Sequence, residues 1–235
     1  MRRNSISTVI LLTLGVMLTV LLPCRGQSDA ELPSDATVEP SQTIPIMYIT
    51  TADGKPITTK KEYKRATFYI TDPAGKVSLG TATEPLGMNI RGRGHSSWKG
   101  DKKPYKIKLD EKLSLMGMPK NKHWALLTFW PPTMAGMKLG KLMGMAWTPS
   151  TKPIEVVLNG DYIGLYLLTE TIRIGKNRVN IYEQPDNNED VATITGGWLV
   201  EVDNNKEQNQ ISFRENDRWI INITYHSPKV LSTAQ

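Results

Sequence analysis

The segment from residue 91 to residue 127 constrains the fold more than any other stretch, because it joins a glycine-rich turn to two predicted strands. Gly92 and Gly94 lie in the turn, and we expect both to adopt positive φ values that direct backbone N–H groups inward. Such a turn can hold an anion. Further donors in the same turn are the side chains of Arg91, Arg93, Ser96 and Ser97.

The strand after this turn is predicted to carry two lysines on one face. Period-two alternation puts Lys106 and Lys108 together, while the opposite face is apolar through Tyr105, Ile107 and Leu109. Loop donors followed by two aligned lysines are typical of a polyphosphate site. The alternative is structural, because glycine turns are common on surfaces and lysines often form the solvated face of an edge strand.

Several motifs occur in a fixed order along the chain, at residues 91–98, 102–109, 115–124, 156–170, 177–181 and 196–203. They include Arg-Gly-Arg-Gly-His-Ser-Ser-Trp, Lys-Lys-Pro-Tyr-Lys-Ile-Lys-Leu and Gly-Gly-Trp-Leu-Val-Glu-Val-Asp. This series resembles the signature of the CotH (spore-coat protein H) kinase-like family, over about residues 44–235.

The resemblance implies ATP- and Mg²⁺-dependent phosphorylation of hydroxyl groups on exported or surface proteins. It also implies the N-terminal portion of an atypical kinase-like α+β fold, mainly antiparallel sheet with one or two helices. The residues expected to bind nucleotide or phosphate are Arg91, Arg93, Ser96, Ser97, Lys106, Lys108 and Glu170. For Glu170, three alternatives remain: a hinge near adenine, a pair with one of the two lysines, or a structural carboxylate.

The chain departs from the family pattern in two places. Gly136 and Met137 stand where relatives typically have an Arg-Asn pair. The sequence also ends at Gln235 without a Trp-Asp-Phe-Asp-like motif, which in the family binds metal and lies downstream. We therefore expect a truncated member with no catalytic residues, little or no catalysis, and an exposed apolar patch.

The first 26 residues have the pattern of an export signal. Arg2 and Arg3 precede an uncharged apolar run from Ile6 to Leu22. Three outcomes stay open: cleavage after Gly26, lipidation of Cys24 as a cell-envelope lipoprotein, and an uncleaved anchor. Membrane contact is expected only through this segment. Residues 27–43 are polar and aperiodic, and predict a flexible linker before a domain at residues 44–235.

Charge and residue types exclude several functions. Removing residues 1–26 takes away three arginines and no acid, so the net charge falls from +6 to +3, which is 26 basic minus 23 acidic residues. This surplus is small for a nucleic-acid-binding protein. His95, His123 and His226 have no metal-ligand spacing, and the single cysteine lies in the targeting segment, so neither a zinc site nor a hydrolase triad is predicted.

Turn signals and apolar periodicity predict an antiparallel sheet with short connections. The clearest signal is Asn159-Gly160-Asp161, a hairpin turn between two apolar runs. One helix is expected over residues 133–147, with Gly136, Gly140 and Gly144 on one face. Either this face is a groove that accepts a neighbouring strand, or the helix is a methionine-rich segment of the core. Besides the strand with Lys106 and Lys108, strands are predicted over residues 44–50, 66–71, 87–90, 126–130, 154–158, 162–168, 198–202 and 220–224.

A non-enzymatic interpretation is compatible with the same residues. In it, the exported chain is a binding or surface-assembly module that uses its sheet to contact a partner. Binding of ATP with Mg²⁺ distinguishes the two hypotheses.

Overall fold

The computed structural model describes residues 39–41, 43–202, 210–215 and 219–235. The predicted targeting segment with Cys24 and most of the predicted linker at residues 27–43 lie outside the described residues.

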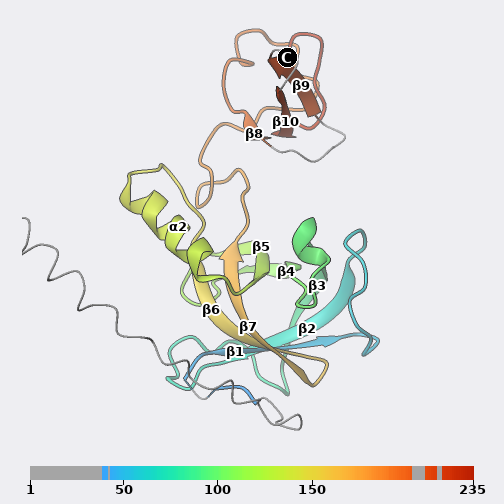
Figure 1. Ribbon diagram of the computed structural model, residues 1–235, viewed down its shortest axis with the longest axis vertical. Helices are drawn as coiled ribbons and strands as arrows, with labels where there is room; N and C mark the ends of the chain where they lie inside the picture. The colour runs from blue at the N-terminus through green and yellow to red at the C-terminus, as the bar shows by residue number, and fades with distance from the viewer. Residues whose placement is uncertain (1–38, 42, 203–209, 216–218) are drawn as a thin grey trace, which may run out of the picture. The chain divides into compact units, whose positions relative to one another are not determined.

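Seven strands form a closed barrel (Figure 1). Their order around the barrel is β1-β2-β3-β4-β5-β7-β6. The bounds are β1 Ile46–Thr51, β2 Lys64–Thr71, β3 Leu86–Gly92, β4 Tyr105–Leu113, β5 Asn121–Thr128, β6 Thr151–Leu158 and β7 Asp161–Glu170. The hairpin predicted at Asn159-Gly160-Asp161 is confirmed, and β7 is central between β5 and β6 as its apolar faces indicate.

The barrel closes through a parallel pairing of β1 with β6, in which Ile46 lies opposite Glu155 and Ile49 opposite Leu158. The predicted α+β, kinase-like sheet with one or two helices is therefore wrong: the chain is mostly β, with a closed barrel and a single α-helix in the described part. The local pairs were predictable from their turns. The closing pair was not, because no short turn connects β1 to β6.

The barrel interior is the hydrophobic core. Alternate residues of each strand point inward, and Met47, Met88, Ile107, Trp124 and Leu126 are all buried there. In β4 the predicted alternation is confirmed: Tyr105, Ile107 and Leu109 are buried, while Lys106 and Lys108 stand on the outer face. The outer face of the barrel wall is therefore where β4 presents charge.

The helix α2, Pro131–Leu142, is shorter than the predicted helix over residues 133–147. It begins with prolines that need no intrahelical N–H partner, and it ends before Gly144, whose φ of +82° leaves the helical region. Of the three glycines, only Gly140 is closely approached, by Met145 and Thr148 of the chain's own return. The glycine face therefore accepts this return segment and not a strand.

The remaining strands form a three-stranded antiparallel sheet in the order β8-β10-β9. Their bounds are β8 Leu199–Val202, β9 Gln210–Glu215 and β10 Trp219–Ser227. The strand predicted over residues 198–202 is present as β8, and its Val200 and Val202 side chains are exposed.

Exposed apolar side chains gather on α2 and on the turn that follows it. Leu139, Leu142 and Met143 have helical i, i+3, i+4 spacing and are 56%, 76% and 75% exposed. Met145 is exposed as well. In the described ranges every helix is too short or too polar to cross a membrane.

Candidate functional site

The glycine turn of residues 91–98 begins in the last two residues of β3 and contains the 3₁₀ turn η1, Ser96–Trp98. Gly94 has a φ of +85°, as predicted, but Gly92 lies within β3 and does not adopt a positive φ. Its role is close packing, because a Cβ atom at Gly92 would stand 2.4 Å from the Trp98 ring. The absence of a side chain at position 92 therefore leaves room for the Trp98 ring against the strand.

Part of the predicted anion-binding backbone is already used. The Gly92 amide donates to the Thr59 carbonyl at 2.9 Å, and the Arg93 amide donates to the Pro104 carbonyl at 3.1 Å. Ser96 and Ser97 lie in the exposed turn, where no hydrogen bond or ion pair of the described residues joins either hydroxyl to the arginines or lysines. Side-chain donors in this region are therefore more available to an anion than the backbone N–H groups of Gly92 and Arg93.

Basic side chains meet on the outer face of β3 and β4. Arg91 is the cross-strand partner of Lys106, and Arg93 follows directly after β3. The charge of Arg173, which lies beyond the end of β7, also acts on Lys106. We call Arg91, Arg93, Lys106 and Arg173 the outer cationic cluster.

The electrostatics of this cluster are those of like charges held together. Burial lowers the pKa of Lys106, and the charges of Arg91, Arg173 and Arg93 lower it further. Burial also lowers the pKa of Arg93, with a contribution from Arg91 and an opposing one from Glu201. Across the described residues, no member of the cluster forms an ion pair with a carboxylate.

Arg91 is the most constrained member of the cluster. Its Nη1 atom donates to the Lys60 carbonyl, and its guanidinium lies 5.1 Å from the centroid of the Tyr63 ring. These contacts hold the arginine in place without neutralising it.

His123 extends the basic surface along β5, opposite Lys108. Burial, followed by the charges of Arg173, Lys106, Lys108 and Lys122, lowers the pKa of His123 to about 4. The sequence pattern indicated neither His123 nor Arg173 as part of this basic surface. The position of His123 beside Lys108 follows from the pairing of β4 with β5. The spacing of residues 122–123 in the sequence does not show this pairing.

Glu170 lies on the other side of the barrel wall. It is the cross-strand partner of Trp124, whose side chain fills the core, whereas Lys106 pairs with Ala125 on the outer face. Glu170 therefore pairs with neither Lys106 nor Lys108. It forms a buried ion pair with Arg178 and accepts a hydrogen bond from the Ser150 amide at 2.9 Å.

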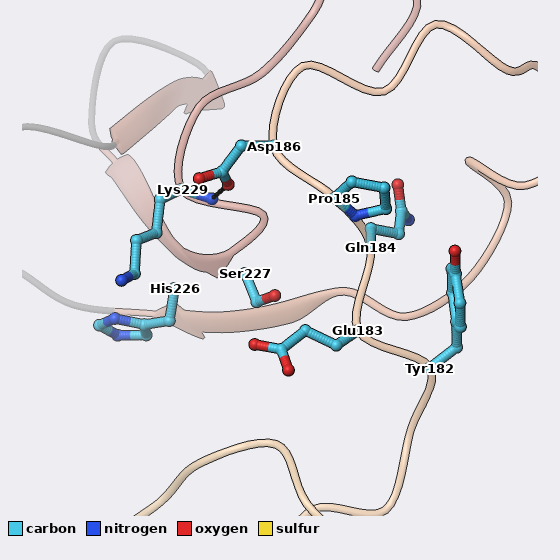
Figure 2. A pocket seen from close by; sticks show the side chains of 8 residues that line it. All are labelled: Tyr182, Glu183, Gln184, Pro185, Asp186, His226, Ser227 and Lys229. Atoms are coloured by element: carbon cyan, nitrogen blue, oxygen red, sulfur yellow. Dashed lines mark hydrogen bonds between the residues drawn. The ribbon is translucent and has the colours of Figure 1, made fainter.

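Two pockets lie away from the outer cationic cluster. One, of about 390 Å³, lies between residues 182–186 and the end of β10. Figure 2 shows Glu183 on one segment and Ser227 on the other, with Asp186 accepting a hydrogen bond from the Lys229 amide at 2.6 Å. The second, of about 430 Å³, is lined by Glu170 and Arg178. The described residues include no group of three His, Cys, Asp or Glu side chains able to hold a metal ion.

A family model described as CotH kinase protein matches residues 90–218, more than half of the chain. The chain therefore belongs to the CotH kinase family, as its motifs indicated. No curated protein matches it. The matched segment begins one residue before Arg91 and includes all members of the outer cationic cluster.

Proposed function

We propose that the outer cationic cluster binds the phosphate groups of a nucleotide, ATP being the one that the family implies. The observation that carries the proposal is the convergence of Arg91, Arg93, Lys106 and Arg173 without a carboxylate partner in the described residues. Unpaired like charges that are partly buried destabilise one another. A bound phosphate removes this repulsion and accepts charge-assisted hydrogen bonds.

Chemically, these residues bind and orient. Arginine offers a planar fork to two phosphate oxygens, and Lys106 offers a point charge beside it. The cluster does not fit Mg²⁺, since its members are cations and the carboxylate whose charge reaches Arg93, Glu201, is held by His226 at 2.7 Å.

The proposal extends to two points that rest on the sequence. The chain is exported through residues 1–26, either secreted or anchored by a lipidated Cys24, and it meets an exported or surface protein. By itself it binds nucleotide with little or no phosphoryl transfer. A phosphorylation assay with radiolabelled ATP on a generic acceptor protein tests the second point, and incorporation of label into acceptor contradicts it.

Isothermal titration of the whole chain with ATP, ADP, AMP and adenosine tests the phosphate clamp. Affinity should fall as phosphates are removed, and Lys106→Ala and Arg93→Ala should each weaken ATP binding at least tenfold, since a charged hydrogen bond contributes about 1.5–3 kcal/mol. Lys112→Ala is the matched control, because Lys112 is an exposed lysine of the same strand β4.

Two results contradict the clamp. One is ATP binding that does not saturate. The other is binding that is equal in Lys106→Ala, Arg93→Ala and Lys112→Ala. In either case the non-enzymatic surface module becomes the better description of the chain.

A further inference from the structure

A second basic site lies at the end of the barrel, in the cavity of about 430 Å³. The end of α2, the return segment after it, the end of β7 and the turn at residues 176–180 line this cavity. Its basic residues are Lys141, Lys176 and Arg178, and its acidic residue is Glu170. The cavity has the size of small-molecule sites.

Arg178 is held rigidly in the wall of this cavity. Its side chain is nearly fully buried, and its guanidinium lies 5.2 Å from the centroid of the Trp124 ring. The Nη1 atom pairs with Glu170 and donates to the Asn177 carbonyl at 3.4 Å. The plane of the guanidinium is therefore set by an ion pair and an aromatic face.

The other edge of the same guanidinium has no acceptor. The Nε and Nη2 atoms of Arg178 are buried and make no hydrogen bond with the described residues. A buried donor without an acceptor destabilises the protein, because it has lost its hydrogen bonds to water. Since Nε and Nη2 together form an edge that can bind two oxygens of a carboxylate or phosphate, this edge has the geometry of an anion fork.

The charge of the cavity is also uncompensated. Glu170 already has a positive partner, since its Oε1 atom forms the ion pair with Arg178, and its Oε2 atom accepts a hydrogen bond from the Ser150 amide. Lys141 and Lys176 form no ion pair with any described carboxylate. Asn177 and Asn180 also line the cavity, and an asparagine side chain carries a neutral NH₂ donor.

We propose that this cavity binds a small anion through a phosphate or carboxylate group, with the Nε–Nη2 edge of Arg178 as the fork and Lys141 and Lys176 as flanking charges. The site is separate from the outer cationic cluster. No member of that cluster lines the cavity, and Glu170 and Lys106 lie on opposite faces of the wall.

Isothermal titration of the whole chain with inorganic phosphate, pyrophosphate and citrate, at constant ionic strength set with sodium chloride, tests the site. We expect saturable binding of at least one of the three, and comparing citrate with the two phosphates distinguishes the two chemistries. The double variant Lys141→Gln/Lys176→Gln should weaken that binding at least tenfold. The control Lys138→Gln/Lys152→Gln removes two exposed lysines outside the cavity and should bind as the wild type does.

The variants Arg93→Ala and Lys106→Ala separate this proposal from the nucleotide clamp. Anion binding that survives in both of them and falls in the Lys141/Lys176 variant supports the cavity. Binding that is lost in them and retained in the Lys141/Lys176 variant belongs to the outer cluster and overturns the cavity proposal. So does wild-type protein that binds none of the three anions.

Arg178→Lys tests the fork itself. Lysine keeps a positive charge beside Glu170 but has no Nε–Nη2 edge, so anion binding should be lost while the circular dichroism spectrum is retained. Folded Arg178→Lys protein with wild-type affinity contradicts the assignment of the fork. If this variant fails to fold, the Lys141/Lys176 variant decides.

Discussion

The two faces of the barrel wall differ in whether their positive charges are paired with a carboxylate. On the outer face, Arg91, Arg93, Lys106 and Arg173 stand together with no ion-pair partner in the described part of the chain. On the inner side, Arg178 is buried, paired with Glu170 and stacked on Trp124.

Burial explains the difference. A charge that is removed from water must be paired, because isolated buried charges are too costly, whereas a partly solvated charge can remain unpaired. The inner pair is therefore a structural feature with one unused edge, and the outer cluster is available to a ligand. Strand β7 and the segment after it contribute one residue to each face of the wall. Glu170, at the end of β7, points inward, and Arg173 belongs to the outer cluster.

The largest expected effect is on the inner pair. Glu170→Gln leaves Arg178 buried without a counter-charge, so the free energy of unfolding should fall by about 3–5 kcal/mol. The midpoint of urea denaturation measures it, with Glu183→Gln as an exposed control. The double variant Glu170→Leu/Arg178→Met should recover most of the loss. A Glu170→Gln variant as stable as the wild type contradicts the structural role of the pair.

A smaller loss of stability is expected from a change at Gly92, which lies between Arg91 and Arg93 of the outer cluster. Gly92→Ala places a Cβ atom against the Trp98 ring, and overpacking of this kind costs about 1–3 kcal/mol. Thermal denaturation measures the loss. Gly136→Ala is the matched control, because Gly136 lies in α2 with open space around it and should gain about 1 kcal/mol. Equal stability of the two variants speaks against close packing at Gly92.

The dependence of folding stability on pH should report the positive charge around His123, next to the outer cluster. Burial and nearby cations lower the pKa of His123 from 6.5 to about 4, so the unfolded chain binds this proton more readily than the folded protein. The folded protein should therefore lose stability as the pH falls from about 6.5 to about 4, and His123→Gln should reduce that loss. Bound ATP at the outer cluster should raise the pKa of His123, as measured by NMR titration of its ring protons. An unchanged pKa places the nucleotide elsewhere.

The smallest effect is expected for the outer cations themselves. Lys106→Met removes a repelled, half-buried charge, so the free energy of unfolding should stay within about 0.5 kcal/mol of the wild-type value or rise. Urea denaturation of Lys106→Met beside Glu170→Gln makes the comparison direct. A loss as large as that of Glu170→Gln shows that Lys106 is structural, and the contrast between the two faces then fails.

The comparison also explains which site residues were predictable. Period-two alternation in β4 correctly put Lys106 and Lys108 on the outer face, because side-chain direction in a strand follows from sequence spacing alone. Glu170 was less predictable, since its partner depended on which face of β7 turned inward. Arg173 was missed because its position next to Lys106 arises from the pairing of β5 with β7.

Local patterns in the sequence by themselves determined the hairpin at Asn159-Gly160, the two faces of β4, the helix after β5 and membership of the CotH kinase family. Turn chemistry and side-chain alternation act over a few residues, so they can be read directly. Only the tertiary structure decided that β1 pairs with β6 to close a barrel, and that Arg178 rather than a lysine neutralises Glu170. These contacts join segments without a connecting turn, and their stability comes from burial that exists only after the chain has folded.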